Sequence, residues 1–586
     1  MAKNPILDSI AHSPILEVIP QEALERLLEA GQQKLIPSGE ILFSVDDYPN
    51  GIYFVVSGSI QISSPQPSGR DKVIAQVRKG EIIGEMSLLM ERPHIHTAKA
   101  IRDTQVVFLS RTVFDETVER FPKTVQLLSK RTIQRYEQLV QGHADSMIPK
   151  SIACLSAGQS EQLKTYTLKL VEAFGKSNRV KRLSSQDNPS PVEIDKLEQE
   201  HDFLVYEADT HPSAWSKRCM READRIFLIA QSDSDFKLNA LEKELFEDHI
   251  PKTNKQVELI IVHPKTEKTA SKTKNWLENR PVFLSHHVHL EQKEDLLRQV
   301  RFILNKAIGV VLSGGGMRCF SQVGFLQAME EEKIPVDMIY GCSGGSIIGS
   351  LFAMGLSAEA IGQSCISKFD QYKPLTHYSA PLISLIDDKY IWKIARELYN
   401  DQQIEDLAIN FACIASDIVK AQKIIHRSGS VAQSVISSMS IPGIFPPVIQ
   451  DGKFLVDGGI LENLPIHSMR ESFRGHIIAI DASPTEEFMH LRIPSSMPST
   501  LDILKSWVNP LRKNKAMPNI KDIITRSVLL SGVQQRLQAA QETPFFMGMP
   551  VEDFDILDTS KIAKIIEIGY QHAKPLVKQW KKDLLD

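Results

Sequence analysis

The sequence has no long apolar segment and only six cysteines, and each scarcity narrows what the protein can be. No run of about 18 apolar residues occurs, so we expect no transmembrane helix. The N-terminus lacks a charged stretch followed by an apolar one, so we expect no signal peptide. The cysteines are scattered without a C-x-x-C pair, which favours reduced thiols over a disulfide framework or a zinc site. We therefore expect a cytoplasmic protein whose contact with membranes is transient and peripheral.

The chain also lacks a large net charge of either sign. The net charge is −4 over 586 residues, so there is no global basic field and no nucleic-acid partner is expected. No G-x-x-x-x-G-K-[ST] motif follows any strand-like run, which excludes this form of ATP chemistry. The length predicts several domains, and nothing in the composition sets the oligomeric state.

Short β-prone runs separated by turn residues fill positions 33 to 110, followed by a helical pattern from Arg111 to about Gly142. This pattern predicts a small all-β roll or barrel over residues 1–142. A glycine and a glutamate, Gly84-Glu85, then open a short helical turn. Such a turn can offer N–H groups to a phosphate and a carboxylate to a ribose hydroxyl.

The segment from Gly84 and Glu85 to Thr97 resembles the phosphate-binding cassette of cyclic nucleotide-binding domains. The resemblance covers residues 12–140 and makes Gly84, Glu85 and Thr97 candidate nucleotide-binding residues, with Glu85 on the ribose. His94 stands where the family has an arginine, and histidine lacks its permanent charge and two-pronged fork. The replacement argues against binding of a common cyclic nucleotide and favours a docking or autoinhibitory module. We expect His94 and His96 to be exposed loop histidines, with a pH sensor or metal pair as the alternative.

Residues 143–306 alternate between strand-like and helical patterns. Residues 143–160 are interpreted as a linker, and strands are expected at 202–206, 225–230 and 257–262. Alternation at this spacing predicts a parallel sheet covered by helices. Residues 286–289 read His-His-Val-His, and we interpret these histidines as lying on a strand and not as ligands of a metal site.

Two glycine-rich turns follow strand-like runs between Ile308 and Ser350. The first contains Gly314-Gly315-Gly316, and the second is a G-x-S-x-G motif centred on Ser343. Between a strand and a helix, G-x-S-x-G holds a nucleophilic serine at the tip of a tight turn. The bare N–H groups of the first turn can form an oxyanion hole. The alternative interpretation of the G-x-S-x-G motif is a plain strand–helix turn.

Asp457-Gly458-Gly459 follows a predicted hairpin and supplies a candidate base for Ser343. A carboxylate with a pKa near ~4 is a weak base, but burial would raise that pKa toward the working pH. The competing interpretation is a Ser–Asp–His triad in which His467 or His476 is the base.

Residues 308 to about 485 resemble the patatin-like phospholipase family, because the triple glycine with Arg318, the elbow, a proline-rich loop and Asp457-Gly458-Gly459 occur in order. The resemblance implies a dyad in which Ser343 is the nucleophile and Asp457 the base, without a metal. It also implies that Arg318 helps to orient the oxyanion turn or a substrate phosphate. Met317, Cys319 and Cys342 depart from the usual pattern, and Cys342 is interpreted as a small residue that fits the elbow.

The whole arrangement is similar to the neuropathy target esterase family, with one nucleotide-like module. We expect a β-roll (1–142), an α/β linker domain (143–306), an α/β patatin-like domain (307–499) and a helical extension (500–586). A basic and apolar surface around Lys505, Trp507 and Arg512 is expected to rest on anionic lipid or to be a solvated connection. The predicted function is hydrolysis of carboxylic esters in lysophospholipids or phospholipids, regulated by the N-terminal domain and without a cofactor. The alternative is a ligand-sensing or scaffold protein with a silent hydrolase fold.

Overall fold

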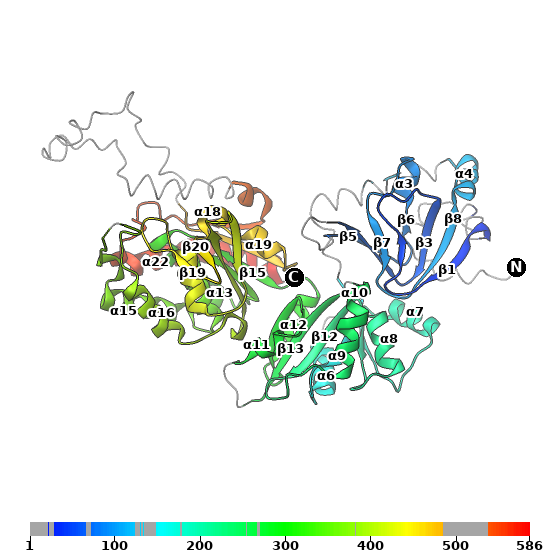
Figure 1. Cartoon of the computed structure of the whole chain (residues 1–586), viewed down its shortest axis with the longest axis horizontal. Coiled ribbons are helices and arrows are strands. Elements are labelled where there is room, and N and C mark those ends of the chain that lie inside the picture. The colour runs from blue at the N-terminus through cyan, green and yellow to red at the C-terminus, as the bar shows by residue number, and fades with distance from the viewer. Residues whose placement is uncertain are drawn as a thin grey trace, which may run out of the picture. The chain divides into compact units, whose positions relative to one another are not determined.

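The computed structural model describes residues 29–65, 72–122, 148–265, 270–483 and 537–585, apart from 176, 177, 254 and 381, together with 22, 129, 130 and 133. The chain divides into two compact units (Figure 1). The first contains the N-terminal β-roll and an α/β domain, and the second contains the predicted hydrolase domain with the C-terminal helix. None of the helices in this described part is long and apolar enough to cross a bilayer.

The N-terminal residues form the antiparallel β-roll that the sequence predicts. Two four-stranded sheets, ordered β1-β8-β3-β6 and β2-β7-β4-β5, bury Val55, Ile60 and Val106 in a shared core. The helix predicted from Arg111 begins there and is capped by Ser110, whose hydroxyl accepts the Val113 N–H. The elements are β1 (Gln32–Ile36), β2 (Ile41–Phe43), β3 (Gly51–Ser57), β4 (Ser59–Ser64), β5 (Lys72–Arg78), β6 (Ile82–Ile83), α3 (Glu85–Leu89), β7 (Thr97–Ala100), β8 (Thr104–Ser110) and α4 (Arg111–Arg120).

The next domain is a parallel sheet ordered β10-β11-β9-β12-β13-β14, with helices from the intervening segments. The interpretation of residues 143–160 as a linker was wrong, because β9 occupies Ser151–Ser156 near the middle of this sheet and is entirely buried. Its apolar run is short and rich in small residues, so it resembles a connecting segment until neighbouring strands cover it. The strands are β9 (Ser151–Ser156), β10 (Val180–Leu183), β11 (Phe203–Glu207), β12 (Arg225–Gln231), β13 (Gln256–His263) and β14 (Leu284–His289). The helices are α6 (Leu163–Phe174), α7 (Pro191–Glu200), α8 (Ala214–Glu222), α9 (Ala240–Glu244), a π-turn (Leu245–His249), α10 (Ile250–Thr253), α11 (Thr273–Leu277) and α12 (Lys293–Ile303).

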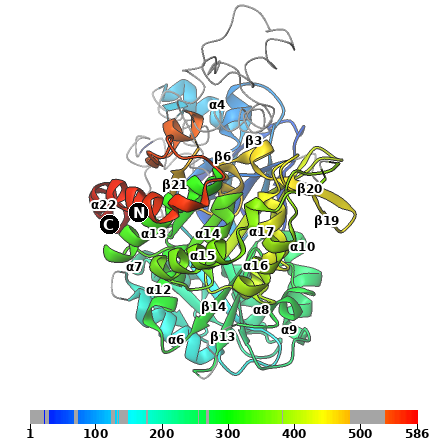
Figure 2. The ribbon, with the colours of Figure 1, turned by 90° about the vertical axis from the view of Figure 1, so that its left-hand side faces the viewer.

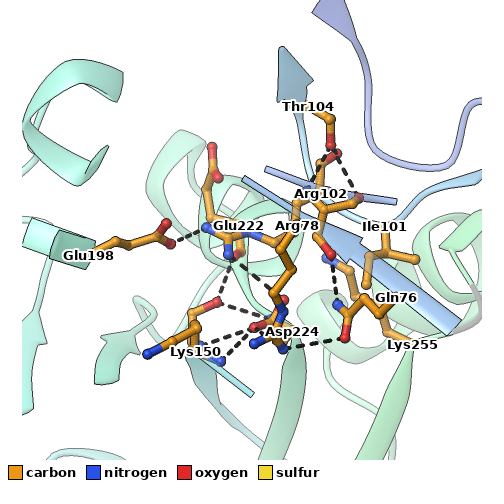
Figure 3. A network of polar contacts seen from close by, with 12 residues as sticks. Gln76, Arg78, Ile101, Arg102, Thr104, Lys150, Glu198, Glu222, Asp224 and Lys255 are labelled. Atoms are coloured by element: carbon orange, nitrogen blue, oxygen red, sulfur yellow. Dashed lines mark hydrogen bonds and ion pairs between the residues drawn. The ribbon is translucent and has the colours of Figure 1, made fainter. Parts of the chain in front are cut away.

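A network of buried charges joins the β-roll to this sheet domain (Figure 3). Arg102, in the turn between β7 and β8, forms ion pairs with Glu198 of α7 and with Asp224, which precedes β12. Arg78 approaches the same Asp224 carboxylate at 3.8 Å, and the Lys150 N–H donates to it at 2.7 Å. Because breaking a buried pair leaves a charge without compensation, the network fixes the β-roll to its neighbour.

The predicted hydrolase domain is built on a sheet ordered β19-β20-β17-β16-β15-β21-β22, with β18 paired to β17. Every residue of β15 and β16 is buried, as expected for central parallel strands covered on both faces. The strand at residues 476–481 is not the edge of the sheet, because β22 pairs in parallel with it. The strands are β15 (Ile308–Leu312), β16 (Met338–Cys342), β17 (Asn410–Asp417), β18 (Gln422–His426), β19 (Val448–Gln450), β20 (Lys453–Asp457), β21 (His476–Asp481) and β22 (Phe545–Gly548). The main helices are α13 (Ser321–Glu331), α14 (Gly344–Ala353), α15 (Ala358–Tyr372), α16 (Lys389–Tyr399), α17 (Val431–Met439), α18 (Gly459–Glu462), α19 (Ile466–Arg470) and α22 (Ile562–Leu585).

The C-terminal helix α22 lies beside α13 (Figure 2) and carries Pro575 within its length. This confirms a helical end to the chain, although the extension also contains β22. Residues 500–536 of the expected helical extension lie outside the described residues, as does the basic surface around Lys505, Trp507 and Arg512.

Candidate active site

Ser343 occupies a sharp turn between β16 and α14, as the G-x-S-x-G spacing predicts. Its backbone has φ 50° and ψ −128°, a conformation that L-residues rarely adopt, and it is the N-cap residue of α14. The Ser343 N–H donates to the Ser438 hydroxyl at 3.0 Å, and that hydroxyl donates to the Ile414 carbonyl at 2.6 Å. Strained backbone of this kind persists only where its surroundings enforce it, and it is concentrated at functional sites.

Asp457 lies at the end of β20, and its carboxylate is hydrogen-bonded to Ser343. The side chain is buried, with 3% of the residue exposed, and Oδ1 accepts the Gly459 N–H at 2.7 Å. Burial raises the pKa of Asp457 to about 6, although the bonds from Ser343 and Gly459 oppose the increase. Among the described residues no cation forms an ion pair with Asp457, so the structure brings together the candidate nucleophile and a carboxylate of raised basicity.

The triple-glycine turn contributes two open N–H groups, and not three. Gly314 donates its N–H to the Asn463 carbonyl at 3.2 Å, so the expectation that Gly314 is an oxyanion donor does not fit this geometry. Within the described part of the chain, no acceptor takes the N–H of Gly315 or Gly316. These two groups are therefore the ones that can receive a developing oxyanion.

Arg318 is buried, with 2% exposed, and faces away from solvent. Its Nε donates to the Phe554 carbonyl at 2.6 Å and its Nη2 to the Glu552 carbonyl at 2.8 Å. The contact with a substrate phosphate, one of the two roles expected for Arg318, does not fit this placement. The other role, orientation of the oxyanion turn, does fit it.

An apolar cavity opens beside Ser343. Its walls come from the triple-glycine turn, α14, α15, α16, α17, the loop after α17 and the segment before α22. Ser343 is one of the few polar residues that line the cavity, and most of the others are aliphatic or aromatic. Lining residues include Ile347, Phe369, Leu398, Val435, Phe445 and Ile556.

No triad is assembled among the described residues. His467 is exposed on α19, and His476 lies at the first residue of β21, the opposite end of the sheet from the elbow. His426 is buried near α17, but its Nε2 bonds the Ser437 hydroxyl at 3.0 Å, and burial lowers its pKa to about 4. The geometry therefore favours the dyad interpretation over the triad.

The cassette of the β-roll fits a cyclic phosphate poorly. His94 was expected to be exposed, but it is buried and stacked on Phe43 with ring centroids 3.7 Å apart. Burial lowers the pKa of His94, so a neutral ring stands where the family's arginine would pair with phosphate. Glu85 is buried at the start of α3, and the Thr97 hydroxyl accepts the Val45 N–H at 3.4 Å.

The histidines of β14 lie on a strand, as predicted. His286 contacts Glu258 at 3.1 Å on one face, and His287 contacts His263 at 2.8 Å on the other. Among the described residues no group of three or more His, Cys, Asp or Glu side chains could hold a metal ion. All six cysteines are free and buried, and burial keeps the pKa of Cys342 well above its ordinary value.

Two site residues were missed from the sequence. Ser438 supports the backbone of Ser343, and Asn463 accepts from Gly314 while its amide donates to the Ser483 hydroxyl at 2.7 Å. Asn463 follows Asp457-Gly458-Gly459 by four residues, which is a usable signal. Ser438 lies within an unremarkable helical pattern and carries no signal of its own.

Three family models match consecutive parts of the chain. They are the cyclic nucleotide-binding domain over residues 33–121, the Neuropathy Target Esterase family P-loop like domain over 194–313, and Patatin-like phospholipase over 310–470. Among solved structures, the catabolite activator protein of Thermus thermophilus is 22% identical over 28% of this chain and 70% of that one, with a TM-score of 0.21.

Curated relatives match nearly the whole chain. Patatin-like phospholipase domain-containing protein 6 of Homo sapiens is 26% identical over 93% of this chain and 44% of its own length. Lysophospholipase NTE1 of Lodderomyces elongisporus is 26% identical over 93% and 45%, and neuropathy target esterase sws of Drosophila melanogaster is 25% identical over 92% and 42%. The chain thus spans less than half the length of these relatives.

The predicted domain types are confirmed by these matches and by the fold. The chain therefore contains a region similar to patatin-like phospholipases, preceded by regions similar to the P-loop like domain of the Neuropathy Target Esterase family and to cyclic nucleotide-binding domains.

Proposed function

We propose that the protein hydrolyses carboxylic ester bonds of lysophospholipids or phospholipids with a Ser343–Asp457 dyad. The observation that carries the proposal is the buried Asp457 carboxylate, bonded to Ser343 at a strained elbow and raised in pKa to about 6. A group that titrates near the working pH accepts a proton while remaining mostly ionised.

In the first half-reaction, Ser343 Oγ attacks the ester carbonyl and its proton passes to Asp457. The N–H groups of Gly315 and Gly316 stabilise the oxyanion of the tetrahedral intermediate. Its collapse breaks the ester C–O bond, and the leaving glycerol oxygen takes the proton from Asp457. In the second half, Asp457 accepts a proton from water, the hydroxide attacks the acyl-serine, and the fatty acid leaves as Ser343 regains its proton.

The apolar cavity beside Ser343 suits an acyl chain. Its walls are nearly all apolar, so methylene groups leave water without stranding polar atoms. This favours a lysophospholipid, the substrate class in the names of the fungal relatives.

Peripheral contact with a lipid surface is also proposed, through residues 382–386. Leu382 is 91% exposed and Ile383 70% exposed, an unfavourable state for side chains facing water alone. The same segment bonds the loop after α17, with the Leu385 N–H donating to Gly443 at 2.9 Å. Ile441 and Phe445 of that loop line the cavity, so lipid at this segment lies near its entrance. The double change Leu382→Ser with Ile383→Ser should weaken sedimentation with phosphatidylserine vesicles and leave hydrolysis of a soluble short-chain ester intact.

The proposal includes control by the N-terminal β-roll, which Arg102 fixes to the neighbouring domain. Arg102→Glu would place like charges together and release it. Altered turnover of lysophospholipid in this variant would support control, and unchanged turnover in a folded variant would remove it.

The decisive experiment combines labelling with hydrolysis. The parent should react with a fluorophosphonate probe and release fatty acid from lysophosphatidylcholine, faster than from diacyl phosphatidylcholine. Ser343→Ala should do neither while keeping the parental circular dichroism spectrum. A parent that neither labels nor hydrolyses would favour the silent-fold alternative, and an active Ser343→Ala would refute the mechanism.

A further inference from the structure

A short segment near the C-terminus, Glu552 to Leu557, lies against the oxyanion turn. The Met317 N–H donates to the Ile556 carbonyl at 2.9 Å. A Cβ on Gly316 would lie 2.3 Å from the same carbonyl oxygen, so only glycine permits this approach. We call residues 552–557 the C-terminal strap.

Arg318 ties the strap to the turn from the other side. Its guanidinium donates from Nε to Phe554 O at 2.6 Å and from Nη2 to Glu552 O at 2.8 Å. These are charge-assisted bonds in a buried setting, and they join residues more than 230 positions apart in the chain. The planar fork reaches two carbonyls at once, which a lysine ammonium on a flexible stem does less well.

The strap also forms part of the cavity wall. Ile556 and Leu557 line the apolar cavity, together with Gly316 and Met317 of the oxyanion turn. The same few residues therefore contact both the N–H donors and the space that receives the acyl chain.

Elements on both sides hold the strap in place. Before it, β22 adds to the sheet beside β21. After it, α22 crosses α13 so closely that a Cβ on Gly569 would lie 2.1 Å from Ser321 O and one on Gly324 2.2 Å from Tyr570 N. Because α13 begins directly after the turn of Arg318, this crossing fixes strap and turn relative to each other.

We propose that the C-terminal strap completes the active site, with Arg318 as a positioning residue that sets the N–H groups of Gly315 and Gly316, and with Leu557 as a determinant of acyl-chain length. The inference rests on the proposed function. The patatin-like phospholipase match ends at residue 470, so the strap lies outside it.

The first test replaces Arg318 by Met and by Lys in the full chain. For a soluble short-chain ester, Arg318→Met should lower kcat by about 10²–10³-fold with KM within twofold, as loss of oxyanion alignment predicts. Arg318→Lys should recover part of that loss. The control is Lys574→Met, which removes the exposed ion pair between α22 and Glu331 and should leave kcat unchanged. A folded Arg318→Met with parental kcat would overturn the positioning role.

The second test uses Leu557→Trp, which adds volume to the cavity wall. Across lysophosphatidylcholines of increasing chain length, the preferred chain should become shorter, with the rate on a butyrate ester retained. An unchanged chain-length profile would overturn the role of Leu557. If Arg318→Met fails to fold, Leu557→Trp and Arg318→Lys still test the proposal.

The two failures are distinguishable with the parental protein. If the parent does not react with fluorophosphonate, the proposed function fails. If the parent reacts, and the Arg318 and Leu557 variants match it in kcat and in preferred chain length, only the inference about the strap fails.

Discussion

Two buried aspartates, one in each unit of the chain, stand in opposite electrostatic settings. Asp224 lies between Arg102 and Arg78 and accepts N–H groups from Lys150 and Ser151. Burial would raise its pKa, but these partners hold the pKa below its ordinary value. Asp457 is as deeply buried, yet among the described residues it has only the Ser343 hydroxyl and one N–H, and its pKa rises to about 6.

The difference separates a structural carboxylate from a chemical one. A compensated charge stays ionised at every physiological pH and stabilises the join between the β-roll and its neighbour. A carboxylate without a cation is costly to keep ionised, and that cost makes it a better base. Burial alone does not identify the functional aspartate, whereas its partners do.

The largest expected effect is on catalysis. Asp457→Asn removes the base, and kcat for lysophosphatidylcholine should fall about 10³–10⁴-fold, equivalent to about 4–5 kcal/mol of transition-state stabilisation. Asp224→Asn is the matched control, since Arg102–Glu198 and Lys79–Asp195 remain to hold the β-roll. Its folded fraction should react with fluorophosphonate within twofold of the parent. If both variants lost catalytic activity to the same extent, the two aspartates would not differ in function as described.

The next largest effect is on stability. Here Asp224→Asn should be the more damaging of the two substitutions. Asp224→Asn leaves Arg102 with a weaker set of partners and should destabilise the first unit by about 3–5 kcal/mol. Thermal unfolding followed by circular dichroism should show an earlier first transition. Adding Arg102→Met removes the uncompensated charge and should restore part of the loss. A transition unchanged by Asp224→Asn would mean that the network contributes little.

The smallest effect is a gain in stability for Asp457→Asn, and its size depends on pH. Because the folded state raises the pKa of Asp457 from its ordinary value near ~4 to about 6, the cost of ionising it grows between these two pH values and is fully present above about pH 6. Asp457→Asn should therefore be more stable than the parent by about 2–3 kcal/mol at pH 8, by roughly half of that at pH 5, and nearly equal to it at about pH 3.5. For Asp224 the lowered pKa gives stability that is present at neutral pH and lost only in acid. Parallel pH curves for parent and Asp457→Asn would contradict the raised pKa.

Much of the site was predictable because its signals are local. G-x-S-x-G, the triple glycine and Asp457-Gly458-Gly459 each place a required residue within a few positions of its supporting glycines. The alternation of strands and helices likewise predicted the parallel sheet of the linker domain, because each element carries its own periodicity.

The remainder depends on contacts between distant segments. β9 and β22 are short and weakly patterned, and they become strands only because neighbouring strands pair with them. The direction in which Arg318 points is set by carbonyls that follow it by more than 230 residues. A carbonyl bond carries no side-chain signature, so no pattern in the sequence marks it.

The most direct test is the rate at which fluorophosphonate modifies Ser343, measured from pH 4.5 to 9 in the parent and in Asp457→Asn. The account predicts that the parental rate rises with pH through one inflection near 6 and then stays level, as the Asp457 carboxylate loses its proton. Asp457→Asn should be at least 100-fold slower and nearly independent of pH over this range. A variant that labels at the parental rate, or that keeps the inflection near 6, would contradict Asp457 as the base.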